Sequence, residues 1–114
     1  MGTYYHITRK KSLSSIMEHG LVPLYGQMSD AIMEERQAVY LFKELSEVAY
    51  ALDDWYGKLM GCRNNRDELA LLQVDVPDDF PLTERYEWEM IAYRPIPPQY
   101  LHEIPVPQPQ KQET

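Results

Sequence analysis

The chain has 114 residues, of which 44% are hydrophobic and 25% are charged, a balance typical of one small globular domain. Its 18 acidic and 11 basic residues give a formal net charge of −7, which disfavours extended nucleic-acid binding because phosphate backbones would be repelled. The single cysteine, Cys62, excludes an internal disulfide and a multi-cysteine zinc site. With no long apolar run and no signal-peptide pattern, we expect a cytoplasmic protein without a membrane span.

The first part of the chain predicts a strand followed by a helix. Residues 3–8, "TYYHIT", mix aromatic and β-branched side chains as strands do. Residues 11–20, "KSLSSIMEHG", carry apolar residues at helical spacing, and Gly20 suits the left-handed position that ends a helix. A short helical turn is expected within residues 29–35.

The middle of the chain predicts a buried strand, a long helix and another strand. The short apolar run 38–42, "AVYLF", is typical of a central strand that is covered on both faces. From Leu45 to Leu59 apolar residues recur at helical spacing, with acidic residues between them. A mobile surface loop is expected at 61–68 and a strand at 69–77.

The last part predicts two more strands and a tail. Residues 85–95, "RYEWEMIAYRP", fit one strand, and "IPPQYLHEIPV" reads as a tight turn leading to a short final strand. The polar, proline-rich residues 106–114 are expected to be disordered. The chain is therefore predicted to be a single α+β domain over residues 1–105.

Three features bear on chemistry, in a chain without a glycine-rich phosphate loop, a nucleophile elbow or a zinc-binding "HExxH" motif. His6-Ile7-Thr8 lies on the first strand, Tyr40 lies in the buried run, and Glu87-Trp88-Glu89 lies on a late strand. If 85–95 is one strand, both carboxylates point to the same face, because side chains alternate along a strand.

In their order and placement, these residues resemble the His-Tyr-Glu branch of the ADP-ribosyltransferase superfamily, over roughly residues 4–104. The resemblance implies a split β-sheet core with two main flanking helices and a cleft for NAD as substrate. It implies that His6 hydrogen-bonds a ribose of NAD and that Tyr40, with Tyr50 as its aromatic partner, stacks on nicotinamide. It gives Glu89 the role of promoting cleavage of the nicotinamide–ribose bond.

The implied chemistry is physically consistent. Loss of nicotinamide leaves an oxocarbenium-like ribose cation, which a fixed carboxylate such as Glu89 stabilises as the charge develops. Glu87, the first acid of the pair, would orient the accepting group. Thr8, on the same side of the strand as His6, is a candidate supporting contact. Arg9, which opens the basic run Arg9-Lys10-Lys11, is a candidate contact for the dinucleotide pyrophosphate.

Each residue also has a structural interpretation. His6 is also consistent with a purely structural role, and Tyr40 and Tyr50 are consistent with packing in the core. Paired acids on a strand are also typical of a solvent-exposed face. The basic run Arg9-Lys10-Lys11 is also consistent with a solvent-exposed start of the following helix. Asp53 and Asp54 are expected to be plain helix surface.

Three functions stay open from the sequence. The first is a mono-ADP-ribosyltransferase, a glycosyltransferase that moves ADP-ribose from NAD to a macromolecule, for which the acidic chain favours a protein over a nucleic acid. The second is an NAD-dependent RNA 2'-phosphotransferase, which needs several basic side chains to hold RNA phosphate. The third is a non-catalytic module that binds a nucleotide or a protein. The Ser-Thr-Ser motif of the Arg-Ser-Glu branch is missing, so arginine-directed toxins are a weaker analogy.

Overall fold

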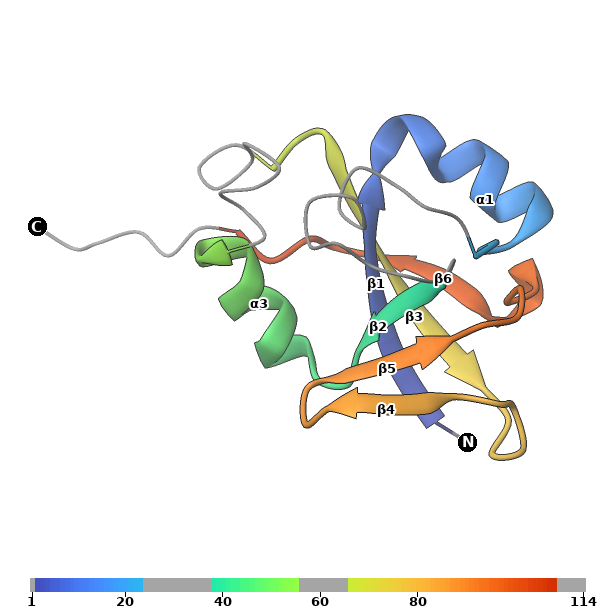
Figure 1. The fold of residues 1–114 in the computed structure, drawn as a ribbon. Coiled ribbons are helices and arrows are strands. Elements are labelled where there is room, and N and C mark those ends of the chain that lie inside the picture. Colours follow the sequence, from blue (N-terminus) through green and yellow to red (C-terminus); the bar gives the residue numbers. More distant parts are fainter. Residues whose placement is uncertain (1, 24–37, 56–65, 109–114) are drawn as a thin grey trace, which may run out of the picture.

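The computed structural model describes residues 2–23, 38–55 and 66–108 (Figure 1). In chain order its helices and strands are β1 (Gly2–Arg9), η1 (Lys10–Ser12), α1 (Leu13–His19), β2 (Val39–Phe42), α3 (Leu45–Asp53), β3 (Leu69–Val76), β4 (Thr83–Tyr86), β5 (Glu89–Ala92), η2 (Pro98–Tyr100) and β6 (Leu101–Ile104). The predicted turn at 29–35 and the end of the helix after residue 55 lie outside the described residues. Within the described part of the chain, no helix is long and apolar enough to cross a membrane.

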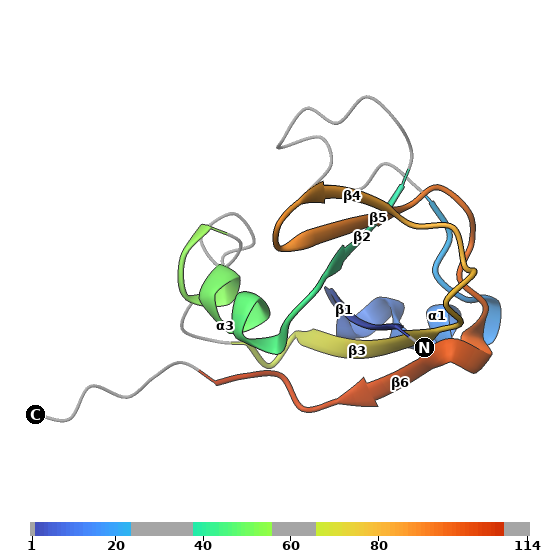
Figure 2. The same ribbon diagram turned by 90° about the horizontal axis from the view of Figure 1, so that it is seen from below.

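The strands form one six-stranded antiparallel sheet in the order β4-β5-β2-β1-β3-β6. In β1 all eight residues pair with β3, but between β1 and β2 a single pair, Tyr5 opposite Phe42, is in register. The half β4-β5-β2 therefore diverges from the half β1-β3-β6, as Figure 2 shows from below. The expected α+β class is confirmed, with a sheet that narrows to one pair at its centre.

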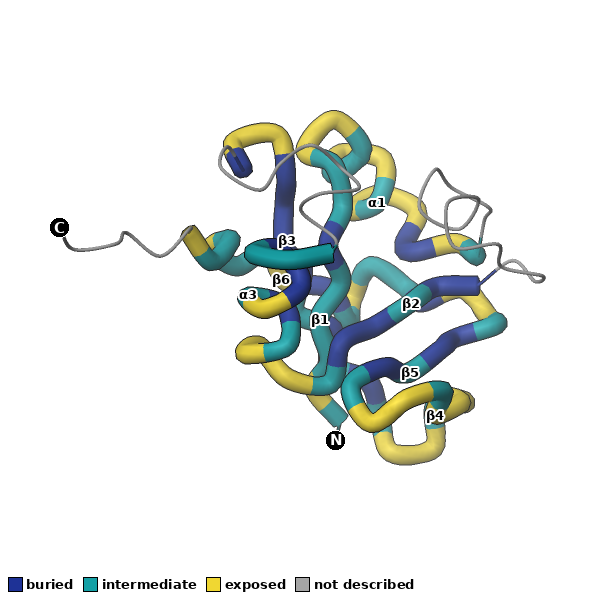
Figure 3. Tube along the Cα trace, turned by 60° about the vertical axis from the view of Figure 1, so that its left-hand side comes forward, coloured by how far each residue is buried: buried dark blue, intermediate teal, exposed yellow. Residues whose placement is uncertain are grey.

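Each face of the sheet carries its own helix and its own apolar cluster. On one face α3 packs through Val48, Ala51 and Leu52 against residues of β1, β2 and β3. On the other face α1 packs through Leu13 and Ile16 against a cluster built from β2, β3, β5 and β6. Burying both faces explains the near-continuous apolar run of β3, whose residues are largely buried (Figure 3).

Residues 85–95 do not form the one strand that the sequence predicted. The chain turns at Glu87 and Trp88, so that β4 and β5 make a hairpin, and β4 lies exposed at the edge of the sheet (Figure 3). The physical reason is that Trp88 folds back from the turn onto Phe42 and Trp55, with ring centroids 5.7 Å away from each. This burial overrides the strand-like alternation of the segment.

Gly20 ends α1 as predicted. Its φ of 87° lies in the left-handed region, and its N–H donates to the Ile16 carbonyl at 2.7 Å. Leu21 and Ile96 then exchange two backbone hydrogen bonds of 2.9 and 2.8 Å. The end of α1 is thereby fixed against the segment that leads into η2.

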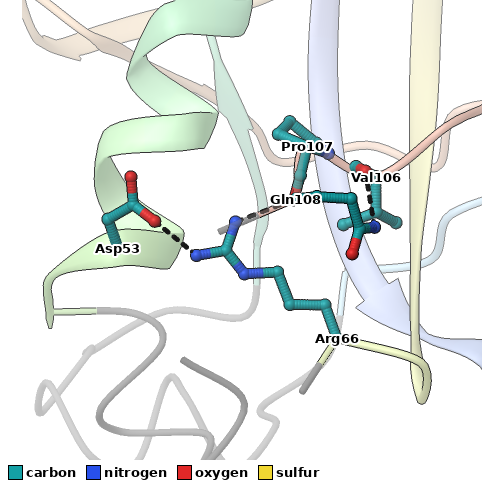
Figure 4. A network of polar contacts seen from close by, with 5 residues as sticks. All are labelled: Asp53, Arg66, Val106, Pro107 and Gln108. Carbon is teal, nitrogen blue, oxygen red and sulfur yellow. Dashed lines mark hydrogen bonds and ion pairs between the residues drawn. The ribbon is translucent and has the colours of Figure 1, made fainter. Parts of the chain in front are cut away.

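Arg66 joins three distant segments (Figure 4). Its side chain is fully buried and donates through Nη2 to Asp53 at the end of α3 and through Nη1 to the carbonyl of Pro107 at 2.7 Å. Two expectations are corrected here: Arg66 is buried, although Asp67 and Glu68 of the same predicted surface loop are exposed, and Asp53 is an ion-pair partner rather than plain helix surface. Residues 61–65 of that predicted loop lie outside the described residues. Residues 106–108 of the predicted tail are described, whereas residues 109–114 lie outside the described residues.

Candidate active site at the centre of the sheet

His6 lies where β1 and β2 diverge. Its Nδ1 is 3.0 Å from the carbonyl oxygen of Tyr40, so Nδ1 carries the proton and donates. Desolvation by burial lowers the pKa of His6, and the hydrogen bond to Tyr40 offsets part of this effect. The neutral ring therefore keeps Nε2 as an acceptor, which suits a ligand hydroxyl.

Tyr40 and Glu89 share the face of the sheet that α3 covers. Phe42 packs in the cluster beneath α3, Tyr40 is two residues before it, and Glu89 lies directly opposite Phe42 on β5. The His6 side chain lies on the α1 side of the sheet and hydrogen-bonds the main-chain carbonyl of Tyr40. The three residues of the predicted set are thus brought to the same part of the sheet from two faces.

Glu89 is buried, as its predicted place in the sheet requires. The residue is 6% exposed, and its Oε1 is shielded from solvent. The Nε of Arg85 lies 3.6 Å from this oxygen. A buried carboxylate is costly even when a cation is nearby, so its presence in a small sheet points to a functional role.

Arg85 is a residue of this site that sequence reasoning missed. Its guanidinium carbon lies 5.9 Å from the centroid of the Tyr40 ring and 5.1 Å from that of the Tyr86 ring. The tyrosine faces attract the cation through their quadrupoles. The hairpin creates the arrangement, because it places Arg85 on β4 next to Glu89 on β5; reading 85–95 as a single strand concealed it.

A cluster of aromatic side chains anchors the β4–β5 hairpin. The rings of Tyr86 and Trp88 stack with centroids 5.5 Å apart and an interplanar angle of 12°. Trp88 in turn contacts Phe42 and Trp55. These contacts hold the start of β5, and with it Glu89, in a fixed position.

Glu87 is not placed as predicted, and Tyr50 does not belong to the core. Glu87 is exposed in the hairpin turn, so it does not share a strand face with Glu89. The face argument for the pair was therefore wrong, although both residues remain at the same hairpin. Tyr50 is 61% exposed on α3, which rules out its interpretation as a core aromatic.

Thr8 and Arg9 lie further along β1. Thr8 is partly buried and on the same side of the strand as His6, as predicted. Arg9 faces the other side, 3.9 Å from Glu68. With Lys10, Lys11, Asp67 and Glu68 it lines a surface depression of about 600 Å³. The three basic residues therefore line this depression together with two carboxylates, those of Asp67 and Glu68.

No protein-family model matches this sequence, and no curated protein matches it either. The assignment of a function therefore rests on the geometry of the residues described above.

Proposed function

We propose that the chain is an NAD-dependent mono-ADP-ribosyltransferase, which cleaves nicotinamide from NAD and transfers ADP-ribose to a macromolecule. The observation that carries the proposal is the position of His6, Tyr40 and Glu89 on neighbouring strands where β1 and β2 diverge, with His6 hydrogen-bonded to the Tyr40 main chain and Glu89 buried on β5. The sheet that narrows there to the Tyr5–Phe42 pair also fits the split core that the resemblance implies.

Each residue has a role that its surroundings favour. His6 accepts a ribose hydroxyl at Nε2, because Tyr40 fixes the proton on Nδ1. Tyr40 offers a ring face that already attracts a cation, and nicotinamide in NAD is a flat cation. Glu89 supplies a carboxylate shielded from water, where it stabilises developing positive charge on the ribose more strongly than in solvent.

We assign supporting roles to three of the other predicted residues, Thr8, Arg9 and Glu87. Thr8 supports His6 from the same side of β1. Arg9 offers a positive charge to the pyrophosphate at the end of that strand. Glu87, exposed at the hairpin turn, is positioned to orient an accepting group that approaches Glu89 from solvent.

The test is release of nicotinamide from NAD by the purified protein, alone and with total cell lysate as the source of acceptors. We expect slow release alone and faster release with lysate, accompanied by ADP-ribose on protein. Release of phosphate from 2'-phosphorylated RNA, without product on protein, would favour the phosphotransferase instead. Binding of NAD with no turnover under any condition would leave a nucleotide-binding module.

A further inference from the structure

Arg85 occupies a distinctive place in the site. It lies on the edge strand β4, and its guanidinium carbon is 5.9 Å from the Tyr40 ring centroid and 5.1 Å from the Tyr86 ring centroid. Its Nε is 3.6 Å from Glu89 Oε1. A flat, delocalised cation is therefore held by two tyrosine rings beside a buried carboxylate.

This is also the set of groups that a nicotinamide cation requires. A ring that carries a positive charge gains from aromatic faces and from a nearby carboxylate for the same electrostatic reasons as a guanidinium does. The two cations would compete for one place, because Tyr40 and Glu89 cannot serve both at once at these distances.

We propose that Arg85 occupies the nicotinamide subsite in the unliganded protein and leaves it when NAD binds, and that Tyr86 is the second aromatic wall of that subsite. The inference rests on the proposed function. Entry of NAD is then an exchange of one cation for another, so Glu89 keeps a positive neighbour throughout. Tyr50, the aromatic partner expected from the sequence, has no part in this arrangement.

Arg85 has solvent into which its side chain can move. Its side chain is 29% exposed, and β4 lies at the edge of the sheet, so the side chain has solvent beside it. The Glu89 side chain is only 8% exposed, so its carboxylate requires a positive neighbour, and the incoming nicotinamide takes that role when Arg85 leaves. Trp88, which stacks on Tyr86 at 5.5 Å, holds the aromatic wall in place when Arg85 moves.

The first test measures the Kd for NAD by calorimetry in the full chain and in Arg85→Gln. Removing the competing cation should tighten NAD binding about fivefold, the effect expected from one partly exposed cation contact. Arg85→Lys, which keeps a charge, should bind much as the unaltered chain does. Arg94→Gln is the matched control, because Arg94 is exposed beyond β5 and its loss changes the net charge equally.

The second test addresses the aromatic wall in the Arg85→Gln background. Adding Tyr86→Leu should weaken NAD binding about fivefold, whereas adding Tyr50→Leu should change it by less than about twofold. Thermal melting of each variant establishes that it is folded.

The outcomes separate the two proposals. If the unaltered chain binds NAD but Arg85→Gln binds it no more tightly than Arg94→Gln does, the inference about Arg85 is overturned and the proposed function stands. The same holds for Tyr86 if Tyr50→Leu is the more damaging change. If no variant binds NAD and none releases nicotinamide, the proposed function is overturned, and this inference with it.

Discussion

At the scale of single residues, the site depends on hydrogen bonds and charges that restrict what each group does. The Tyr40 carbonyl fixes the proton of His6 on Nδ1. Burial lowers the pKa of His6, so the ring is held in its neutral form. Arg85 sits beside Glu89, whose carboxylate is removed from solvent. The acceptor at His6 Nε2 and the carboxylate of Glu89 are therefore set before any ligand arrives.

The lowered pKa of His6 predicts a dependence of stability on pH. Below the ordinary value of 6.5 the unfolded chain binds a proton that the folded chain resists, so the free energy of unfolding falls as pH drops through this range and levels off below the folded pKa. We expect His6→Asn to lose less stability than the unaltered chain between about pH 7.5 and about pH 5, as measured by urea denaturation.

The control for this prediction is His19→Asn, because the His19 side chain is 66% exposed on α1. It should follow the pH dependence of the unaltered chain. Equal pH dependence in His6→Asn and the unaltered chain would show that His6 is not desolvated in the folded state.

At the scale of elements, the connections of α1 and of the β4–β5 hairpin set where the site residues lie. The hairpin puts Glu89 at the start of β5 opposite Tyr86, and it brings the Nε of Arg85, at the irregularity of β4, to 3.6 Å from Glu89. Trp88 anchors the turn. Helix α1 covers the His6 side of the sheet, and its end is fixed by Gly20 and the Leu21–Ile96 bridge. The two faces of the site therefore depend on two separate anchors.

Gly20→Ala should be strongly destabilising. A Cβ at position 20 would lie 2.3 Å from the Ile96 carbonyl oxygen, and a φ of 87° is strained for any residue with a side chain. We expect a loss of at least about 2 kcal/mol in the free energy of unfolding. Urea denaturation beside Ser15→Ala, an exposed change within α1, measures it. A loss no larger than that of Ser15→Ala would contradict the tight contact.

At the scale of the whole molecule, long-range contacts decide what the sequence allows one to predict. The strands at β1, β2, β3 and β6 and the helices α1 and α3 follow from local patterns, because the apolar runs and the helical spacing match the buried faces. The hairpin was missed because its turn carries no glycine, proline or asparagine and is fixed by contacts of Trp88 with residues far away in the chain. Arg66 was missed for the same reason, since Asp53 and Pro107 come from other segments.

The Arg66 network predicts a measurable contribution to global stability. Asp53→Asn removes the charge that Arg66, whose side chain is fully buried, pairs with. Because the Asp53 side chain is 43% exposed, we expect a moderate loss of about 1–3 kcal/mol in the free energy of unfolding. Asp54→Asn, at the adjacent C-cap position of α3, should cost less than about 0.5 kcal/mol in the same urea titration. Equal effects of the two changes would mean that the ion pair adds nothing.

The central claim is that Glu89 stabilises the charge that forms when nicotinamide leaves NAD. It is tested most directly by the rate of nicotinamide release in the unaltered chain and in Glu89→Gln, with Glu103→Gln, an exposed change on β6, as the matched control. We predict that Glu89→Gln lowers the rate of nicotinamide release by about 100-fold or more, while Glu103→Gln keeps the full rate. Thermal melting should show that Glu89→Gln is folded. Release that is undiminished in Glu89→Gln would contradict the account.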